Sequence, residues 1–280
     1  MFDLVCGDWT LHLSDRSHIM GILNVTPDSF YDGGRYLDPE KAVQKAIGIA
    51  GEGADILDIG GESTRPGAEP VSVKEELSRV IPVIQKLQKR IGIPISIDTR
   101  KAVVAEAAIQ AGAQLINDVG GLKDDPDMAK IAAKYQVPVV IMHKKGSPKD
   151  MQVSPKYHDV IQEIHDFMDA SIRSAEDEGI SKKKIILDPG IGFGKTAEDN
   201  YSILRKLSFL QDLGCPVLVG VSRKSFIGNV LNVKEEKRLL GTAAAVAISV
   251  FLGAHIVRVH DVREMVEVVR IADRMKNCGR

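Results

Sequence analysis

The chain has 280 residues, of which 44% are hydrophobic and 27% are charged, so it is long enough to bury one large core. Its formal net charge of -1 argues against a general affinity for nucleic acids or membrane surfaces. The three cysteines are far apart with no spacing typical of a metal site, and the N-terminus lacks the basic start and apolar centre of a signal peptide. These features predict a cytoplasmic protein with free thiols.

The first elements of the chain carry clear start and stop signals. Residues 2–15 consist of short alternating pieces, which predict a small hairpin, and residues 19–25 are typical of a buried strand. Residues 26–35 form a long turn-rich loop with two carboxylates and a glycine pair, which makes them a candidate lid. A helix is predicted from Asp38, as N-cap, to Gly53. Its expected core-facing residues are Ala42, Val43, Ala46, Ile47 and Ala50.

Capping signals mark several later helices. Ser72 and Glu75 predict a reciprocal capping box. Asp125 is expected to start the helix after the fourth strand. Asp261 and Glu264 predict a second capping box at the start of the last helix.

Two further stretches differ from ordinary strand or helix segments. The interval 143–184 is the longest between strands and suggests another functional loop, in which Lys144 and Lys145 are interpreted as solvated surface. Residues 242–252 are the most apolar stretch, yet too short for a bilayer span of about 20 residues, so they predict a buried helix. Nine of the ten residues 243–252 are apolar, which predicts that a second copy of the chain covers the outer face in a homodimer. The alternative is that the neighbouring helices and residues 229–238 of the same chain cover it.

Eight apolar runs, separated by segments with helical spacing, each end on a polar residue. This alternation predicts an α/β fold, a (β/α)8 TIM barrel forming one domain over residues 1–280, with the N-terminal hairpin as a short extension that closes its bottom. Active sites of such barrels lie at the C-terminal ends of the strands, so the polar ends should converge there. They are Asn24, Asp58, Asp98, Asn117 with Asp118, His143, Asp188, Ser222 and His260.

Carboxylates at the mouth of an apolar barrel need hydrogen-bond donors, because removing each carboxylate from water without them costs about 2 kcal/mol or more. Asp98, Asn117 and Asp188 could together bind the N–H groups along the edge of a flat heterocycle. The alternative is that Asp98 and Asp188 only form salt bridges with Lys224 or Arg258.

Cationic residues gather at the last two strands. Arg223 and Lys224 follow the seventh strand, and Arg258 and His260 belong to the eighth, where this fold usually binds phosphate. They imply an anionic substrate group. Asn24 adds an oxygen ligand suited to Mg2+, although one amide alone would not hold the ion.

Other common chemistries are not indicated. Gly190 and Gly194 are separated by three residues, one fewer than the P-loop requires before its Gly-Lys pair, which excludes Lys195 as a Walker A lysine. Neither a Ser/His/Asp set nor a zinc-type spacing appears. His143 has a structural or a catalytic role, and the sequence leaves that choice open.

Seven ordered motifs closely resemble those of the dihydropteroate synthase family. They extend from the first strand to the last, so the resemblance covers nearly the whole chain. The motifs are Met20–Phe30, Asp58–Gly67, Ser96–Arg100, Ile116–Val119, Leu187–Thr196, Gly220–Phe226 and Arg258–Val262.

The resemblance implies a transferase of folate biosynthesis, a homodimer and sulfonamide target, that condenses 6-hydroxymethyl-7,8-dihydropterin pyrophosphate with p-aminobenzoate in the presence of Mg2+. Carried over residue by residue, the pterin-binding positions are Asp98, Asn117, Met142, Asp188, Phe193 and Lys224. The pyrophosphate-binding positions are Asn24, also the metal ligand, Thr64, Arg258 and His260. The p-aminobenzoate-binding positions are Thr64, Arg65, Pro66, Phe193 and Ser225. The catalytic positions are Asp32, Arg65, Asp98, Lys224 and Arg258.

The chain departs from the family pattern at Lys144 and Lys145, where Met and Gln are common, and at Asp199, where His is common. Two other activities stay open. A methyltetrahydrofolate-binding methyltransferase would share the barrel and the pterin carboxylates, but would not need the 26–34 lid or residues 223–225. A pterin-binding barrel without catalysis could lose the anion-binding residues.

Overall fold

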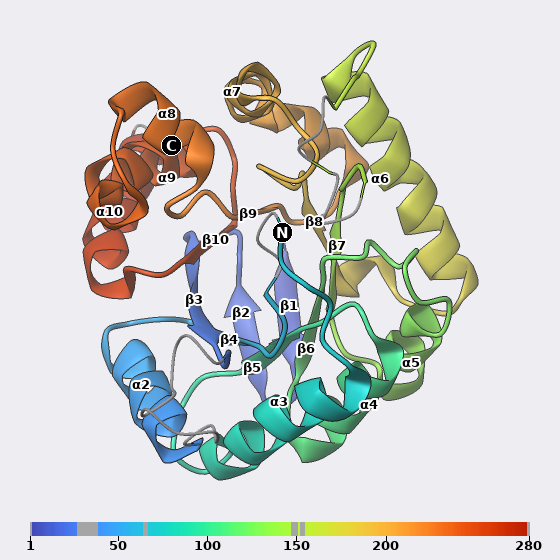
Figure 1. Cartoon of the computed structure of the whole chain (residues 1–280). Helices are drawn as coiled ribbons and strands as arrows, with labels where there is room; N and C mark the ends of the chain where they lie inside the picture. The colour runs from blue at the N-terminus through green and yellow to red at the C-terminus, as the bar shows by residue number, and fades with distance from the viewer. Residues whose placement is uncertain (1, 27–38, 64–66, 147–150, 152–154, 279–280) are drawn as a thin grey trace.

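A computed structural model describes residues 2–26, 39–63, 67–146, 151 and 155–278, and it forms a barrel of parallel strands inside a ring of helices (Figure 1). The eight strands pair in the order β8-β7-β6-β5-β4-β3-β10-β9. A parallel bridge between Leu187 and Val217 joins β8 to the segment that enters β9 and so closes the barrel. The predicted (β/α)8 fold is therefore confirmed.

The barrel strands are short and buried, as expected for apolar runs covered on both faces. β9 is the shortest of them, with two residues. The strands are β3 (His18–Asn24), β4 (Ile56–Gly60), β5 (Ile95–Asp98), β6 (Leu115–Asp118), β7 (Val139–Met142), β8 (Ile185–Asp188), β9 (Leu218–Val219) and β10 (Ile256–Val259).

The N-terminal extension is a hairpin that fills the bottom of the barrel. Strands β1 (Asp3–Cys6) and β2 (Trp9–His12) pair in antiparallel fashion. Leu4, Cys6 and Leu13 pack in one buried cluster with the first residues of the barrel strands. This confirms the predicted hairpin. Burial raises the pKa of the Cys6 thiol to about 12, so the thiol stays protonated.

Helices follow the strands and form the outer ring. They are α2 (Pro39–Gly51), α3 (Val73–Leu87), α4 (Ala102–Ala111), α5 (Met128–Tyr135), α6 (Val160–Asp177), α7 (Ala197–Arg205), α8 (Ser225–Leu231), α9 (Leu239–Phe251) and α10 (Val262–Lys276). Short 3-10 turns are η1 (Lys182–Lys184), η2 (Leu207–Leu213) and η3 (Glu235–Lys237). Among the helices described, none is long and apolar enough to cross a membrane.

The predicted helix starts are partly right. The Ser72 hydroxyl accepts a hydrogen bond from the Glu75 amide at 3.2 Å, but the Glu75 carboxylate accepts from Arg79 rather than completing the box. Asp125 does not start α5, because its carboxylate accepts the Ala102 amide at 2.8 Å and thereby caps α4 instead. Asp38 lies outside the described residues.

The predicted capping box at Asp261 is wrong, because Arg223, a residue distant in the sequence, binds both oxygens of the Asp261 carboxylate. Asp199, which departs from the family pattern, forms a complete capping box with Thr196 at the start of α7. In α2 the predicted residues Ala42, Val43 and Ala46 are buried, and so is Ile49, whereas Ile47 and Ala50 are only half-buried. Helical side chains three or four residues apart share a face, and Ile49 shares that of Ala42 and Ala46.

The predicted apolar helix is α9, which begins earlier than expected and is preceded by α8, an element that the sequence did not reveal. Thr242, Val246, Ser249 and Val250 face the barrel and are buried. The prediction of a wholly buried helix is wrong, because Phe251 on its other side is 56% exposed.

Candidate active site

Four strand ends bring a buried acid, amide and guanidinium cluster together inside the mouth of the barrel. Asn117 Nδ2 donates to Asp58 Oδ2 at 3.0 Å, and Arg258 Nε donates to the same oxygen at 2.6 Å. Arg258 also donates through Nη2 to Asp98 Oδ2 at 2.6 Å. Asp98 therefore does form the salt bridge with Arg258 that was considered as an alternative. Asp58 is the second carboxylate bound by Arg258, and the sequence did not single it out for that role.

The cluster still has unused acceptors. Among the described residues, Asp58 Oδ1 and Asp98 Oδ1 are buried without a hydrogen-bond partner. Burial raises the pKa of the Asp98 carboxyl to about 7, Arg258 opposes that rise, and the Asp58 carboxylate adds to it. Buried acceptors without partners are costly, so these two oxygens are suited to N–H donors of a ligand.

Asp188 forms a second acidic position across the mouth. Its Oδ1 accepts the Gly190 amide at 2.7 Å, and burial raises its pKa while the Lys224 ammonium opposes the rise. The Lys224 ammonium donates to Ile191 O and lies 4.5 Å from the centre of the Phe193 ring. Burial lowers the pKa of Lys224 to about 8, and Asp188 opposes that change. Met142, paired with Asp188 in the β7–β8 register, is buried beside it.

The predicted anion-binding residues lie at the ends of the neighbouring strands. Asn24 ends β3, next to β10. The Ser222 hydroxyl accepts the His260 amide at 3.2 Å and lies 3.0 Å from His260 Nδ1, so it holds the His260 ring at the end of β10. Arg223 does not belong to this group, because Asp261 binds its guanidinium.

The model of the pterin binding enzyme family matches residues 20–260. Dihydropteroate synthase of Bacillus subtilis (strain 168) is 48% identical over 269 residues, which cover 96% of this chain and 92% of that protein. The Yersinia pestis dihydropteroate synthase solved with a sulfonamide drug superposes with a TM-score of 0.93 at 46% identity, covering 99% of this chain and 100% of that one. The Xanthomonas albilineans enzyme solved with 4-aminobenzoic acid gives a TM-score of 0.92 at 46% identity, covering 98% of both chains.

The chain belongs to the pterin-binding enzyme family, among the dihydropteroate synthases. The residues predicted to bind a pterin ring are among those that the barrel brings together. Asp98, Asn117, Asp188, Lys224 and Arg258 all meet in its mouth, and Asp58 is an addition to the predicted set.

Other predicted residues of this pterin-binding enzyme lie elsewhere. Ser225 is the first residue of α8, is exposed, and lines a cavity of about 250 Å3 together with Gly192 and Phe226. Asp32, Thr64, Arg65 and Pro66 lie outside the described residues. A larger hollow of about 650 Å3 along α8 is lined by residues 228–238 and contains no strand-end residue, so it is not part of the barrel mouth.

The sequence also missed Lys195, which is only 2% exposed. Its ammonium donates to His143 Nδ1 at 3.0 Å, to His143 O at 3.2 Å and to Phe193 O at 3.1 Å. Burial, followed by the nearby Lys195 charge, lowers the pKa of His143 to about 3, so the ring is a neutral acceptor. His143 therefore has a structural role, and the hydrogen bonds of Lys195 join the loop after β8 to the end of β7.

That loop approaches β7 very closely. Gly190 has a φ of +68°, and a Cβ there would lie 1.9 Å from His143 O. Any other residue would separate the two loops. Glycine at this position therefore lets the loop after β8 lie against the end of β7.

Asp98 should make the stability depend on pH. The pKa of Asp98 is about 7 in the folded chain, against about 4 in the unfolded chain, so the folded state binds the proton more tightly. The resulting stabilisation is complete below about pH 4 and is lost as the pH rises through about 7. We expect Asp98→Asn to lack this contribution, so that its melting temperature falls less than that of the unchanged chain between pH 4.5 and 8. Asp127→Asn, at an exposed ion pair with Lys130, is the control. Parallel curves for Asp98→Asn and the unchanged chain would contradict the assignment.

Proposed function

We propose how this chain carries out the reaction of the dihydropteroate synthases. It condenses 6-hydroxymethyl-7,8-dihydropterin pyrophosphate with p-aminobenzoate to give 7,8-dihydropteroate and pyrophosphate, a step of folate biosynthesis. The observation that supports this most strongly is the buried cluster with two unpartnered carboxylate oxygens, on Asp58 and Asp98, at the ends of neighbouring strands. A ring edge rich in N–H groups would satisfy both.

In this proposal the pterin enters the mouth of the barrel. Asp98 and Asp188 accept N–H groups of the ring, while Asn117 and Lys224 bind its acceptor atoms. Met142 and Phe193 provide apolar contacts with its faces. The Lys224 ammonium, already near Asp188 and Phe193, keeps the acidic end of the pocket close to neutral.

The pyrophosphate would lie nearer to β3 and β10, with Asn24, Thr64, Arg258 and His260 as its partners. The described residues contain no group of three or more His, Cys, Asp or Glu side chains that could hold a metal ion. Asn24 would be the protein ligand of Mg2+, because its amide oxygen is the type of donor that this ion prefers. When bound, Mg2+ would neutralise part of the pyrophosphate charge.

The chemistry then rests on charge and position. Arg258 and His260 stabilise the departing pyrophosphate, and the electron-rich pterin stabilises the positive charge left at its methylene carbon. The amine of p-aminobenzoate, a weak nucleophile, attacks that carbon after departure has begun. Arg65, Pro66, Phe193 and Ser225 would serve this second substrate, and Asp32 is assigned to the same step.

The methyltransferase alternative fits less well. Its substrate would use the pterin carboxylates but would bring no pyrophosphate to Asn24, Arg258 and His260. A barrel that only binds pterin could lose the anion-binding residues Asn24, Arg258 and His260, whereas this chain keeps all three.

The proposal is tested by incubating the chain with the pterin pyrophosphate. We expect pyrophosphate release to require both p-aminobenzoate and Mg2+, and Asn24→Ala to raise the Mg2+ concentration needed. Release that continues without p-aminobenzoate would indicate another acceptor, and no release would contradict the assigned reaction.

We further propose a cytoplasmic homodimer built on α9 and α10, which pack against each other. Leu240, Ile248 and Phe251 of α9 and Ile271 and Met275 of α10 are more than half exposed. Large apolar surfaces of this kind are usually covered in solution. A symmetric contact of at least about 1,000 Å2 would cover them.

Replacing Ile248 and Phe251 together with Glu should therefore produce a monomer at micromolar concentration, measured by sedimentation. Val103→Glu is the matched control, since Val103 is an equally exposed apolar residue on α4. If the unchanged chain is already a monomer, the proposed dimer is wrong, and the assignment of the enzymatic activity is unaffected.

A further inference from the structure

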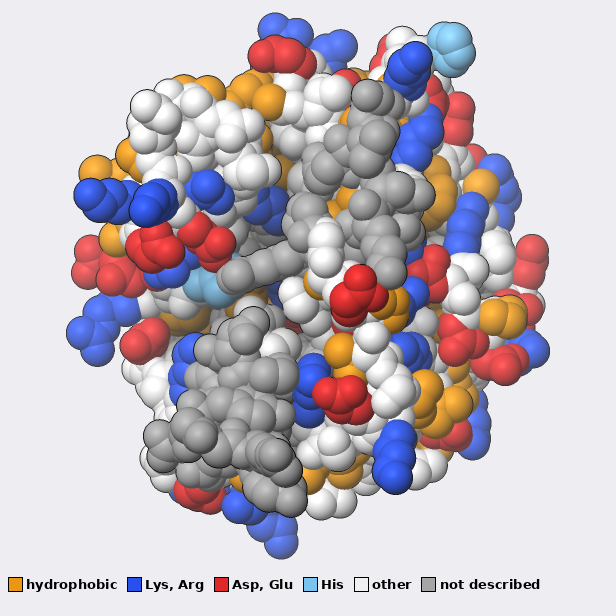
Figure 2. All heavy atoms as spheres, viewed as in Figure 1, with side chains coloured by type: hydrophobic (Ala, Val, Ile, Leu, Met, Phe, Trp, Pro, Cys, Tyr) orange, Lys and Arg blue, Asp and Glu red, His pale blue; other side chains and the backbone are white. Residues whose placement is uncertain are grey.

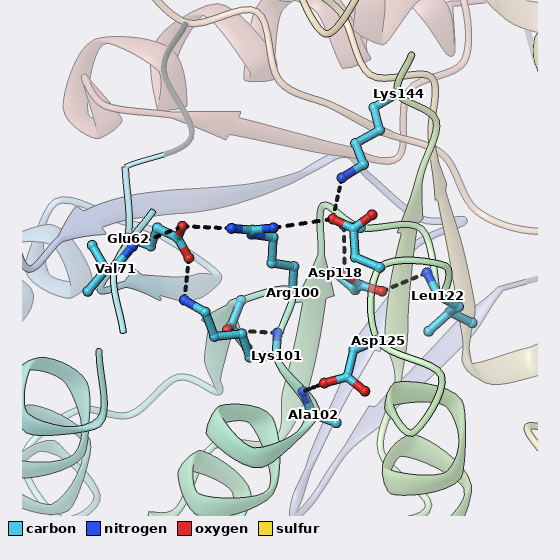
Figure 3. A network of polar contacts seen from close by, with 12 residues as sticks. Glu62, Val71, Arg100, Lys101, Ala102, Asp118, Leu122, Asp125 and Lys144 are labelled. Carbon is cyan, nitrogen blue, oxygen red and sulfur yellow. Dashed lines mark hydrogen bonds and ion pairs between the residues drawn. The ribbon is translucent and has the colours of Figure 1, made fainter. Parts of the chain in front are cut away.

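Lys195 differs from the other cations in the loops at the barrel mouth. Arg100 and Lys101, for example, both pair with Glu62 (Figure 3). On the molecular face shown in Figure 2, basic and acidic side chains are likewise intermixed. Lys195 is buried instead, and within the described part of the chain no carboxylate forms an ion pair with it. Burying a charge without a counter-ion costs free energy, so other acceptors must stabilise this ammonium.

The structure provides an acceptor for each of the three N–H groups of the Lys195 ammonium. Two of these acceptors belong to His143 at the end of β7, the ring Nδ1 and the backbone O. The third is the carbonyl oxygen of Phe193, at 3.1 Å. Because all three N–H groups are used inside the protein, Lys195 affects a ligand only through the residues that it holds.

Phe193 lies at the acidic end of the barrel mouth. The centre of its ring is 4.5 Å from the Lys224 ammonium, and the face of an aromatic ring attracts a cation at this distance. The carbonyl of Ile191, two residues earlier in the same loop, accepts a hydrogen bond from that ammonium. The Asp188 charge acts on Lys224 from the other side and opposes the lowering of its pKa. A shift of Phe193 would therefore disturb the surroundings of two charged groups assigned to the pterin.

Other hydrogen bonds hold the rest of the loop between β8 and α7. The Gly192 amide donates to Asn200 Oδ1 at 2.7 Å, and the Tyr157 hydroxyl donates to Gly194 O at 2.8 Å. Neither bond involves the buried lysine. Removing the lysine ammonium should therefore leave the loop folded and release mainly the carbonyl of Phe193.

We propose that Lys195 is a positioning residue for the pterin. By holding the Phe193 carbonyl against the end of β7, it keeps the Phe193 ring beside Lys224, where the ring of the substrate is received. This inference rests on the proposed function, which assigns Phe193 and Lys224 to the pterin. It gives a role to a lysine whose sequence context resembles a phosphate-binding loop.

Calorimetric titration of Lys195→Met with 6-hydroxymethyl-7,8-dihydropterin pyrophosphate tests the proposal. Methionine has a similar length and can replace the buried stem of the lysine, but it removes the ammonium. Burial lowers the pKa of Lys195 to about 7, so the titrations are made at about pH 6, where the ammonium is protonated. The dissociation constant should rise about tenfold. An unchanged constant would overturn the proposal.

Lys184→Met is the matched control. The Lys184 ammonium, just before β8, donates to the carbonyl of Gln136, just before β7, so it joins the same two strands at the opposite end of the barrel. Its substitution should leave the dissociation constant within about twofold. An equal loss of affinity in both variants would mean that the stability of the strand pair is responsible, and the proposal would be wrong.

A double-mutant cycle with Phe193→Ala identifies the residue through which Lys195 acts. Once the Phe193 ring is absent, Lys195→Met should weaken binding further by no more than about threefold, instead of about tenfold. Additive losses would contradict the proposal, because Lys195 would then act independently of the ring.

Lys195→Gln separates the hydrogen bond from the charge. Glutamine keeps an N–H donor on a neutral side chain only one bond shorter, so the dissociation constant should rise by less than about threefold. The same variant tests the proposal if thermal melting shows that Lys195→Met does not fold. A rise of about tenfold in Lys195→Gln would indicate that the charge, rather than the position of Phe193, matters, and would overturn the proposal.

The unchanged chain tells the two possible failures apart. If it does not bind the pterin pyrophosphate, the proposed function is wrong, and this inference fails with it. If it binds and Lys195→Met binds equally well, the inference alone is overturned.

Discussion

Asp188→Asn should weaken binding of the pterin by roughly 2 to 4 kcal/mol, or about 30-fold to 1,000-fold. The substitution keeps the size of the side chain but replaces one acceptor with a donor. If the new NH2 group replaces Oδ1, it faces the Gly190 amide, which now donates to that oxygen at 2.7 Å. If it replaces Oδ2, it faces the N–H group of the ligand. Either orientation sets two donors against each other.

Calorimetric titration with the pterin pyrophosphate measures this loss directly. Asp212→Asn is a matched control, because that carboxylate is 72% exposed and, within the described part of the chain, forms its ion pair with the surface residue His165. Unchanged affinity in Asp188→Asn would remove Asp188 from the site.

Arg258→Met should have the second large effect, on both stability and turnover. The substitution leaves the carboxylates of Asp58 and Asp98 buried without their shared cation, a change that typically costs about 3 to 5 kcal/mol. It also removes a positive charge from the place where the pyrophosphate departs. We expect the turnover number to fall by about 100-fold to 1,000-fold.

The stability loss should depend on pH in a specific direction. Without Arg258, the raised pKa of Asp98 rises further, so protonation relieves the repulsion between the two carboxyls as the pH falls. Denaturant unfolding of Arg258→Met should therefore show a smaller loss at pH 5 than at pH 8. An equal loss at both values would indicate that packing of the long side chain, rather than its charge, is responsible.

The barrel could be predicted because its signals are local. Each strand is an apolar run that ends in a polar residue, as at Asp98 and Asp188, and parallel strands buried on both faces produce that pattern. The helix starts were less predictable, because a capping residue is also a charge with other partners. Asp261 binds Arg223 instead of its own helix, and those residues are far apart in the sequence.

In the candidate site, too, local signals could be read from the sequence, whereas tertiary contacts could not. Asp98, Asn117 and Asp188 were identified because they end their strands, and the fold brings such ends together. Asp58 had the same signal, but its role became visible only through its bonds to Asn117 and Arg258. Lys195 gave no usable signal, because a lysine after glycines suggests phosphate binding, whereas here it lies buried against His143.

The central claim is that a pterin ring completes the buried acidic cluster. A crystal structure of the chain with bound 6-hydroxymethyl-7,8-dihydropterin pyrophosphate tests it most directly. We expect N–H groups of the ring within hydrogen-bond distance of Asp188 and of at least one of the oxygens Asp58 Oδ1 and Asp98 Oδ1, with the pyrophosphate toward Asn24 and His260. A ring bound outside the barrel mouth, with both of those oxygens still without partners, would contradict the account.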